Sequence, residues 1–275
     1  MAGCYRLELV AECAAPMLPS AAAAYVLTLH ETETFPRLHG VARRTYVQRN
    51  ESFKTCAKGC VRATNQDITH AYARLFATIR EEGPVVVFED DAHLLENAAE
   101  DLAAIDGFVS TRAFSAGLSV YSLGSVGPTV PCGGGHWRYA SFQGMTHAVI
   151  YSDAARAHIA RVRPCEVKHM DMDVVRLMGP HYTYHRPVAV QALPETENSK
   201  TWQGNSLVQR AWARVLRWLI RLLHMDTDPR AGFVALYALQ RVHVLVLIGT
   251  LGIGLSVAAF RLLLRSRVKR EHLAL

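Results

Sequence analysis

The chain of 275 residues lacks several features that would assign it to a class at once. Basic and aromatic residues do not alternate in repeats that could stack nucleic-acid bases, so we predict no nucleic-acid partner. No basic segment leads into the alanine run Ala21–Ala24, so residues 1–23 make a poor signal peptide and are predicted to be an N-terminal extension. Cys56 and Cys60 lie four residues apart, but no second cysteine pair completes a zinc site. The six scattered cysteines are therefore expected to be free, reduced thiols.

What the chain does have is an uneven distribution of positive charge. The formal net charge is +6, and much of the excess follows residue 205, next to apolar runs. Residues 242–260 carry no formal charge if His243 is neutral, and Arg241 and Arg261 flank them. This length is about what a helix needs to span a bilayer. We predict a transmembrane helix over 242–260 and a basic tail over 261–275, with a buried helix of a globular domain as the alternative.

A second pattern lies upstream, over residues 206–224. Arg210, Arg214, Arg217 and Arg221 are spaced to fall on one helical stripe, with apolar residues and tryptophans around it. Such a helix is typical of a membrane interface, although a helix packed on the main domain would show the same pattern. The sequence thus predicts a single-pass membrane protein and leaves the side of its catalytic domain open.

The most informative stretch is Pro84–Asp91. Its apolar, mostly β-branched residues predict a buried strand that ends in three consecutive carboxylates, Glu89, Asp90 and Asp91. Ligand-binding residues of open α/β sheets lie at the carboxyl ends of strands, and a divalent metal would relieve the repulsion among three acids. Asp91 could instead cap a following helix.

Predicted strands and predicted helices alternate along the rest of residues 24–205, and this alternation predicts an α/β domain. Strands are expected at Tyr25–Leu29 and Ala148–Tyr151, and a helix is expected to begin near Asp67. A second acidic cluster, containing Asp171 and Asp173, follows about eighty residues after the first. Either aspartate could cap a helix or deprotonate an acceptor hydroxyl. Two acidic sites are what a group-transfer enzyme needs.

Taken in order, these segments resemble the family 25 glycosyltransferases, which include lipooligosaccharide and collagen galactosyltransferases. The resemblance spans roughly residues 24–202. The segments that carry it are Ala24–Leu29, Gly59-Cys60, Thr69-His70, Val86–Ala92, Ala148–Ala155, His169-Met170-Asp171, Pro187–Gln191 and Ser199.

The resemblance implies a GT-A-type, Rossmann-like domain that binds a nucleotide sugar, a UDP-sugar by preference, with Mn²⁺ or Mg²⁺ on the diphosphate. It implies that Asp91 and Glu89 ligate the metal, and that His70, Glu89 and Asp90 contact the donor. Asp171, or else Asp173, would be the base that takes the proton of the acceptor, and transfer would invert the anomeric centre.

The predicted function is therefore a membrane-anchored, metal-dependent glycosyltransferase that acts on a hydroxyl of a glycan, lipid or protein. The first alternative is a catalytically degenerate, membrane-tethered binding or adaptor protein, since a fold does not guarantee chemistry. A metal-dependent phosphatase or nucleotidyltransferase would also use clustered acids.

Overall fold

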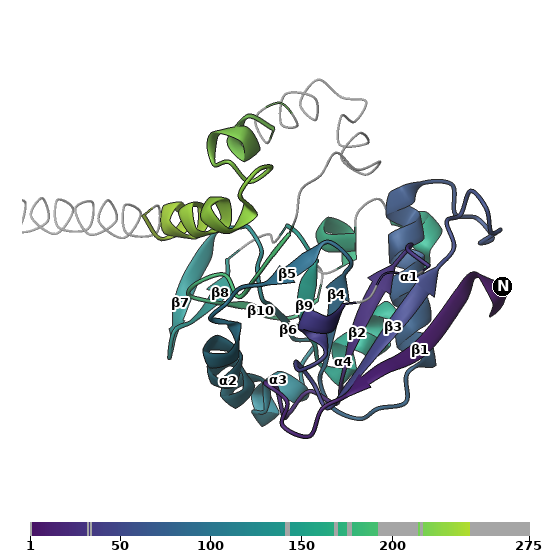
Figure 1. Cartoon of the computed structure of the whole chain (residues 1–275), viewed down its shortest axis with the longest axis horizontal. Helices are drawn as coiled ribbons and strands as arrows, with labels where there is room; N and C mark the ends of the chain where they lie inside the picture. The colour runs from purple at the N-terminus through teal and green to yellow at the C-terminus, as the bar shows by residue number, and fades with distance from the viewer. Residues whose placement is uncertain are drawn as a thin grey trace, which may run out of the picture. The chain divides into compact units, whose positions relative to one another are not determined.

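The structure, a computed structural model, is α/β and is built on a nine-stranded mixed sheet (Figure 1). It describes residues 2–31, 33, 35–140, 144–167, 170–174, 178–191, 214 and 217–242. Residues up to Tyr237 form one compact unit.

The strands of the main sheet follow one another in the order β1-β3-β2-β4-β9-β6-β10-β8-β7. Their bounds are β1 (Tyr5–Glu12), β2 (Ala23–Thr28), β3 (Arg44–Asn50), β4 (Val85–Glu89), β6 (Val120–Ser122), β7 (Thr129–Gly133), β8 (His136–Tyr139), β9 (Ala148–Tyr151) and β10 (His181–Tyr184). The strands β3, β2 and β4 are parallel, and β9 runs antiparallel between β4 and β6. Two further strands, β5 (Ala92–Leu94) and β11 (Ala189–Gln191), form a separate antiparallel pair.

Helices cover both faces of the sheet, and the alternation of β4 shows why. Val85 and Val87 belong to a core cluster with residues of α1 (Thr64–Thr78) and α4 (Asp153–Ile159). Val86 and Phe88 point the other way, into a cluster with residues of α2 (Ala98–Val109) and α3 (Arg112–Ser115). A strand buried on both faces must be apolar throughout, as the sequence of β4 is. Short turns of helix complete the order: η1 (Ala2–Cys4), η2 (Pro36–Leu38), η3 (Pro164–Glu166) and η4 (Met170–Val174).

Several local predictions differ from the structure. Residues 5–12 of the predicted N-terminal extension 1–23 are a strand of the main sheet. Helix α1 begins at Thr64, and Asp67 does not cap it but pairs with Lys58. Asp91 is not a helix cap either, because β5 follows it and α2 begins only at Ala98.

The prediction of a C-terminal transmembrane helix is contradicted. Among the residues that the structure describes, no helix combines the length and the apolar character that crossing a membrane requires. The predicted fold class is therefore wrong in adding a membrane span over 242–260, and the single-pass membrane localisation is wrong with it. Of that span only Val242 is described, at the end of the helical residues 229–242, and residues 243–275 with the basic tail lie outside the described residues.

Part of the predicted interfacial helix 206–224 packs on the domain itself. Of this segment, residues 214 and 217–224 are described. Ile220 and Leu223 contact a cluster formed by Val190, Met225, Phe233 and Tyr237. The hydroxyl of Tyr237 accepts a hydrogen bond from the backbone N–H of Ser125, at 3.1 Å. Apolar residues of 217–237 therefore have partners within the domain, which agrees with the alternative of a packed helix.

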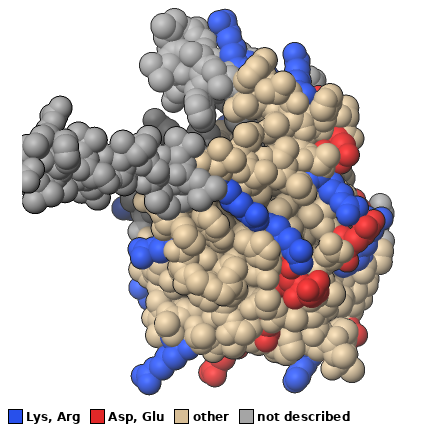
Figure 2. All heavy atoms as spheres, turned by 90° about the vertical axis from the view of Figure 1, so that its left-hand side faces the viewer, with Lys and Arg blue, Asp and Glu red and all other residues tan. Residues whose placement is uncertain are grey.

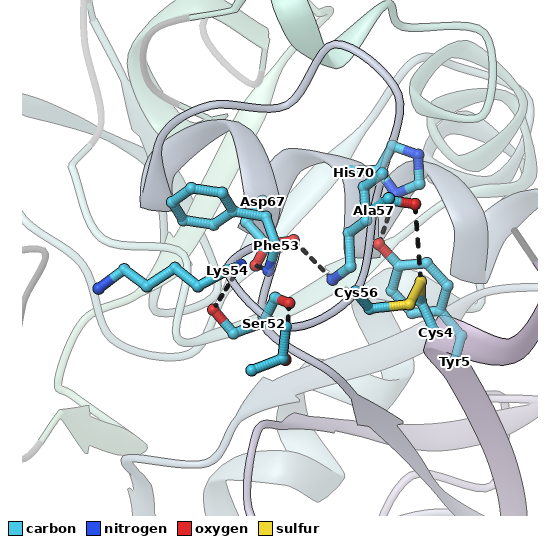
Figure 3. Close-up of a disulfide and its surroundings, with 11 residues drawn as sticks. Cys4, Tyr5, Ser52, Phe53, Lys54, Cys56, Ala57, Asp67 and His70 are labelled. Atoms are coloured by element: carbon cyan, nitrogen blue, oxygen red, sulfur yellow. Dashed lines mark hydrogen bonds and ion pairs between the residues drawn. A yellow bond between two sulfur atoms is a disulfide. The ribbon is translucent and has the colours of Figure 1, made fainter.

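The prediction of free, reduced cysteines is wrong for four of the six. Cys4 is bonded to Cys56, and Cys60 is bonded to Cys165 (the first pair is shown in Figure 3). The partners are 52 and 105 residues apart in sequence, so the short spacing between Cys56 and Cys60 carries no information about their pairing. Only Cys13 and Cys132 are free.

Surface charge is interspersed on the side of the molecule at which β7 lies in Figure 1. Figure 2 shows lysine and arginine side chains there spread singly around an area of uncharged residues, with carboxylates beside some of them. This side presents no continuous field of one sign among the described residues.

Candidate functional site

The three carboxylates follow one another at the carboxyl end of β4, beside the end of β2. Glu89, the last residue of β4, lies opposite Leu27 of β2 in the parallel register. Asp90 turns toward the end of β2, where its carboxylate accepts hydrogen bonds from Thr28 Oγ1 at 2.9 Å and from the N–H of Leu29 at 3.4 Å. Two adjacent parallel strands thus deliver their ends to one edge, where α/β proteins place ligand sites.

Glu89 is half-buried and faces two neutral donors. Its Oε1 accepts hydrogen bonds from the Tyr72 hydroxyl of α1, at 3.1 Å, and from Thr146 Oγ1, at 2.9 Å. Burial, followed by the negative charge of Asp91, raises the pKa of Glu89 to about 8. Glu89 therefore holds its proton at neutral pH unless a positive charge arrives.

Asp91 has one oxygen with a partner and one without. Its Oδ2 accepts a hydrogen bond of 2.7 Å from Gln191 Nε2, whereas Oδ1 is buried with no hydrogen-bond partner. Gln191 is available because β11 pairs with β5, which puts Gln191 opposite Ala92. Burial raises the pKa of Asp91 to about 6, with the hydrogen bond from Gln191 opposing the shift. A buried carboxylate oxygen without a donor is costly, and a bound cation would satisfy it.

The second acidic cluster reaches the same place through the dipeptide Met145-Thr146. The N–H of Met145 donates to Asp171 Oδ2 at 3.2 Å, and the side chain of the next residue donates to Glu89. Met145 has φ of 75°, a conformation uncommon for a residue other than glycine and often found at functional sites. Residues about eighty positions apart in sequence are thereby brought to either side of one backbone turn.

The other predicted site residues are placed differently. His70 lies on α1 and its Nδ1 is hydrogen-bonded to the hydroxyl of Tyr5, beside the Cys4–Cys56 disulfide (Figure 3). No contact joins His70 to the carboxylates within the described structure, so its predicted role in donor binding has no geometric support. The backbone of Asp173 lies in η4, but its side chain is outside the described residues.

The fit to a divalent metal is partial. Among the described residues, no group of three or more His, Cys, Asp or Glu side chains is arranged to hold a metal ion. The carboxylates of Glu89, Asp90 and Asp91 bond to different neighbours. The unsatisfied Oδ1 of Asp91, in a site that two raised pKa values mark as short of positive charge, is the feature that suits a cation.

Sequence reasoning missed the neutral donors that line the site. Tyr72 reads as one member of the apolar stripe of α1, and only the tertiary structure turns its hydroxyl toward Glu89. Thr146 carries no motif at all. Gln191 stands at the end of a segment that the family resemblance singled out, which was the one signal available for it.

Comparison with known proteins assigns the chain to no family. No family model matches this chain, and no curated protein matches it.

Proposed function

We propose that this protein is a metal-dependent glycosyltransferase that moves a sugar from a nucleotide-sugar donor to a hydroxyl acceptor. One observation carries the proposal: the Glu89-Asp90-Asp91 cluster and Asp171 flank the same Met145-Thr146 turn at the carboxyl edge of the sheet. A transferase needs one acidic group near the leaving diphosphate and another near the nucleophile, and this edge offers both.

Asp91 and Glu89 are the residues that would hold the metal. Bound Mn²⁺ or Mg²⁺ would neutralise the negative charge that develops on the departing nucleoside diphosphate. Asp90, held by Thr28 and the N–H of Leu29, keeps the end of β2 beside the site. Asp171 accepts the proton of the acceptor hydroxyl, with its carboxylate oriented by the N–H of Met145. The family resemblance favours a UDP-sugar as donor and inversion at the anomeric carbon.

The first test is titration calorimetry with UDP and with GDP, each with and without Mn²⁺, on the oxidised full chain. Oxidised protein is used because the two disulfides are typical of proteins that fold in oxidising compartments. We expect one nucleotide to bind only with Mn²⁺ and Asp91→Asn to lose that binding. Glu82→Gln is the matched control, because Glu82 is exposed and precedes the opposite end of β4.

A second variant separates transfer from binding. Asp171→Asn should keep metal-dependent nucleotide binding and lose the release of nucleoside diphosphate that depends on an acceptor. If folded wild-type protein binds neither nucleotide, the proposal fails and a catalytically degenerate binding protein becomes the better account. If the protein hydrolyses the nucleotide without any acceptor, a phosphatase or nucleotidyltransferase is indicated instead.

A further inference from the structure

The two outer edges of the main sheet are built differently (Figure 1). The strand β7 has five residues, includes Pro131 and ends in an irregular pairing at Gly133. Proline and bulges are devices that keep an edge strand from pairing with another chain. The strand β1 at the other edge has eight residues, more than any other described strand, and contains neither proline nor glycine. Its pairing with β3 is regular from Tyr5 to Leu9 and shifts register only between Leu9 and Ala11, beyond the stretch considered below. Among the described residues, no strand lies beyond it.

The hydrogen-bond pattern shows which backbone groups of β1 face outward. The N–H of Glu51 donates to the carbonyl of Cys4, and the antiparallel register continues from Tyr5 opposite Asn50. Hydrogen-bonded pairs alternate with non-bonded pairs along such a ladder. Arg6 and Glu8 therefore bond to β3, while Tyr5, Leu7 and Leu9 direct their N–H and C=O groups to the open edge.

The side chains along this edge alternate between apolar and charged, and their order is complementary to itself. Leu7 is 37% exposed and Leu9 is 50% exposed, so both present apolar surface beside the unpaired backbone groups. A two-fold axis at Leu7 would place Leu7 opposite its own copy and Tyr5 opposite Leu9. The same axis would place Arg6 opposite Glu8 of the second copy. These two side chains already pair with each other within one chain, and a dimer would extend that pair across the axis, where opposite charges at facing positions stabilise a strand pair.

We propose that β1 is a dimerisation edge, at which a second copy of this chain pairs antiparallel about Leu7 and joins the two sheets. This inference is independent of the proposed transferase activity. A two-fold contact requires one surface that is complementary to itself, and the order Arg6-Leu7-Glu8 meets that requirement.

The start of β1 is also held rigidly, which favours association. Cys4 is bonded to Cys56, and the hydroxyl of Tyr5 is hydrogen-bonded to His70 of α1 (Figure 3). The ammonium of Lys58 lies 4.5 Å from the centre of the Tyr5 ring. A strand that is already ordered loses little conformational entropy when a partner pairs with it.

Sedimentation equilibrium of the oxidised full chain, over a range of micromolar concentrations, tests the proposal. We expect a monomer–dimer equilibrium for the wild type. Leu7→Lys places two lysines opposite each other at the axis, and we expect it to weaken the dimer tenfold or more. Val130→Lys is the matched control, since Val130 is 43% exposed on the opposite edge strand, and it should leave the dimer unchanged.

Amide hydrogen exchange identifies the edge directly. In the dimer the amides of Leu7 and Leu9 should be protected, and in Leu7→Lys the protection at position 9 should be lost. The amides of Arg6 and Glu8 bond to β3, so their protection in both proteins would show that β1 remains folded. A wild-type protein that stays monomeric throughout, or a dimer that Leu7→Lys leaves intact or that Val130→Lys also disrupts, would overturn the proposal.

Discussion

Carboxylates are withdrawn from solvent at two places in the domain, and residues of α1 take part in both. Near its start, Asp67 accepts hydrogen bonds from the ammonium of Lys58, at 2.6 Å, and from the N–H of Phe53, at 2.9 Å. At the edge of the sheet, Glu89 and Asp91 have only the neutral donors Tyr72, Thr146 and Gln191, and no cationic side chain of the described chain pairs with either. The first setting is balanced in charge and the second is not.

The difference separates a structural site from a candidate functional one. A buried carboxylate with a cation and a backbone N–H is satisfied, and it anchors the loop before α1 without needing a ligand. Burial without a cation raises the pKa of both Glu89 and Asp91, the charge of Asp91 raises that of Glu89 further, and the ionised pair destabilises the folded state. Such an arrangement costs stability, and perturbed carboxylates of this kind are found at functional sites, which is why we propose a cation there.

The largest predicted effect comes from breaking the balanced site. Lys58→Met leaves the Asp67 carboxylate buried without its cation, because the Lys58 side chain is only 1% exposed. We expect the free energy of unfolding to fall by about 3–5 kcal/mol, measured by urea denaturation. Lys54→Met changes an exposed lysine nearby and should alter it by less than about 0.5 kcal/mol.

A double variant sharpens the same point. Lys58→Met combined with Asp67→Asn removes both charges and keeps an acceptor for the N–H of Phe53. It should recover most of the lost stability if the unpaired charge is the cause. Equal losses in the single and double variants would instead mean that packing around Lys58, including its contact with the Tyr5 ring, is what matters.

At Glu89 and Asp91, where no cation balances the carboxylates, we predict a smaller change in the free energy of unfolding. Here substitution should stabilise the protein rather than destabilise it. The pKa of Glu89 is raised from 4.5 to about 8, so the folded state binds this proton more tightly than the unfolded chain does. The stabilisation is complete below about pH 4.5 and is lost as the pH rises through 8. Glu89→Gln should remove that loss and be the more stable protein above pH 8, by on the order of 2 kcal/mol.

Thermal unfolding of both proteins between pH 4 and 9 measures this difference. Asp91 titrates with Glu89, so the wild-type curve reports the pair. Addition of Mn²⁺ at pH 8 should raise the melting temperature of the wild type and have less effect on Glu89→Gln, because the variant supplies one carboxylate fewer. Parallel pH curves for the two proteins would show that Glu89 is not the group whose pKa is raised.

The contrast between the two sites also shows what sequence can predict. The strand Val85–Phe88 and its acidic end were predictable, because an apolar run that stops at three carboxylates has few other interpretations. That Asp171 and Glu89 bond to consecutive residues depends on the conformation of Met145-Thr146, which has no signature in sequence. The cation of Asp67 and the partner of Cys60 are set by contacts between distant segments, which local patterns do not encode.

The smallest predicted effect concerns the side-chain amide of Gln191, which donates to Asp91. The hydrogen bond from Gln191 lowers the pKa of Asp91 against the effect of burial. Gln191→Leu removes that donor, so the pKa of Asp91 should rise further above its usual range. The lost hydrogen bond should cost about 1 kcal/mol at neutral pH, and less in acid, where the carboxyl group is protonated.

Carbon-detected NMR titration of the Asp91 carboxyl group measures this pKa in the wild type and in Gln191→Leu. The prediction also bears on metal binding, since a higher pKa makes protons compete better with a cation for the same oxygens. The affinity for Mn²⁺ should therefore fall in Gln191→Leu near neutral pH and recover as the pH is raised. An unchanged pKa would mean that water replaces the amide, and that the site is more open to solvent than the buried Oδ1 of Asp91 indicates.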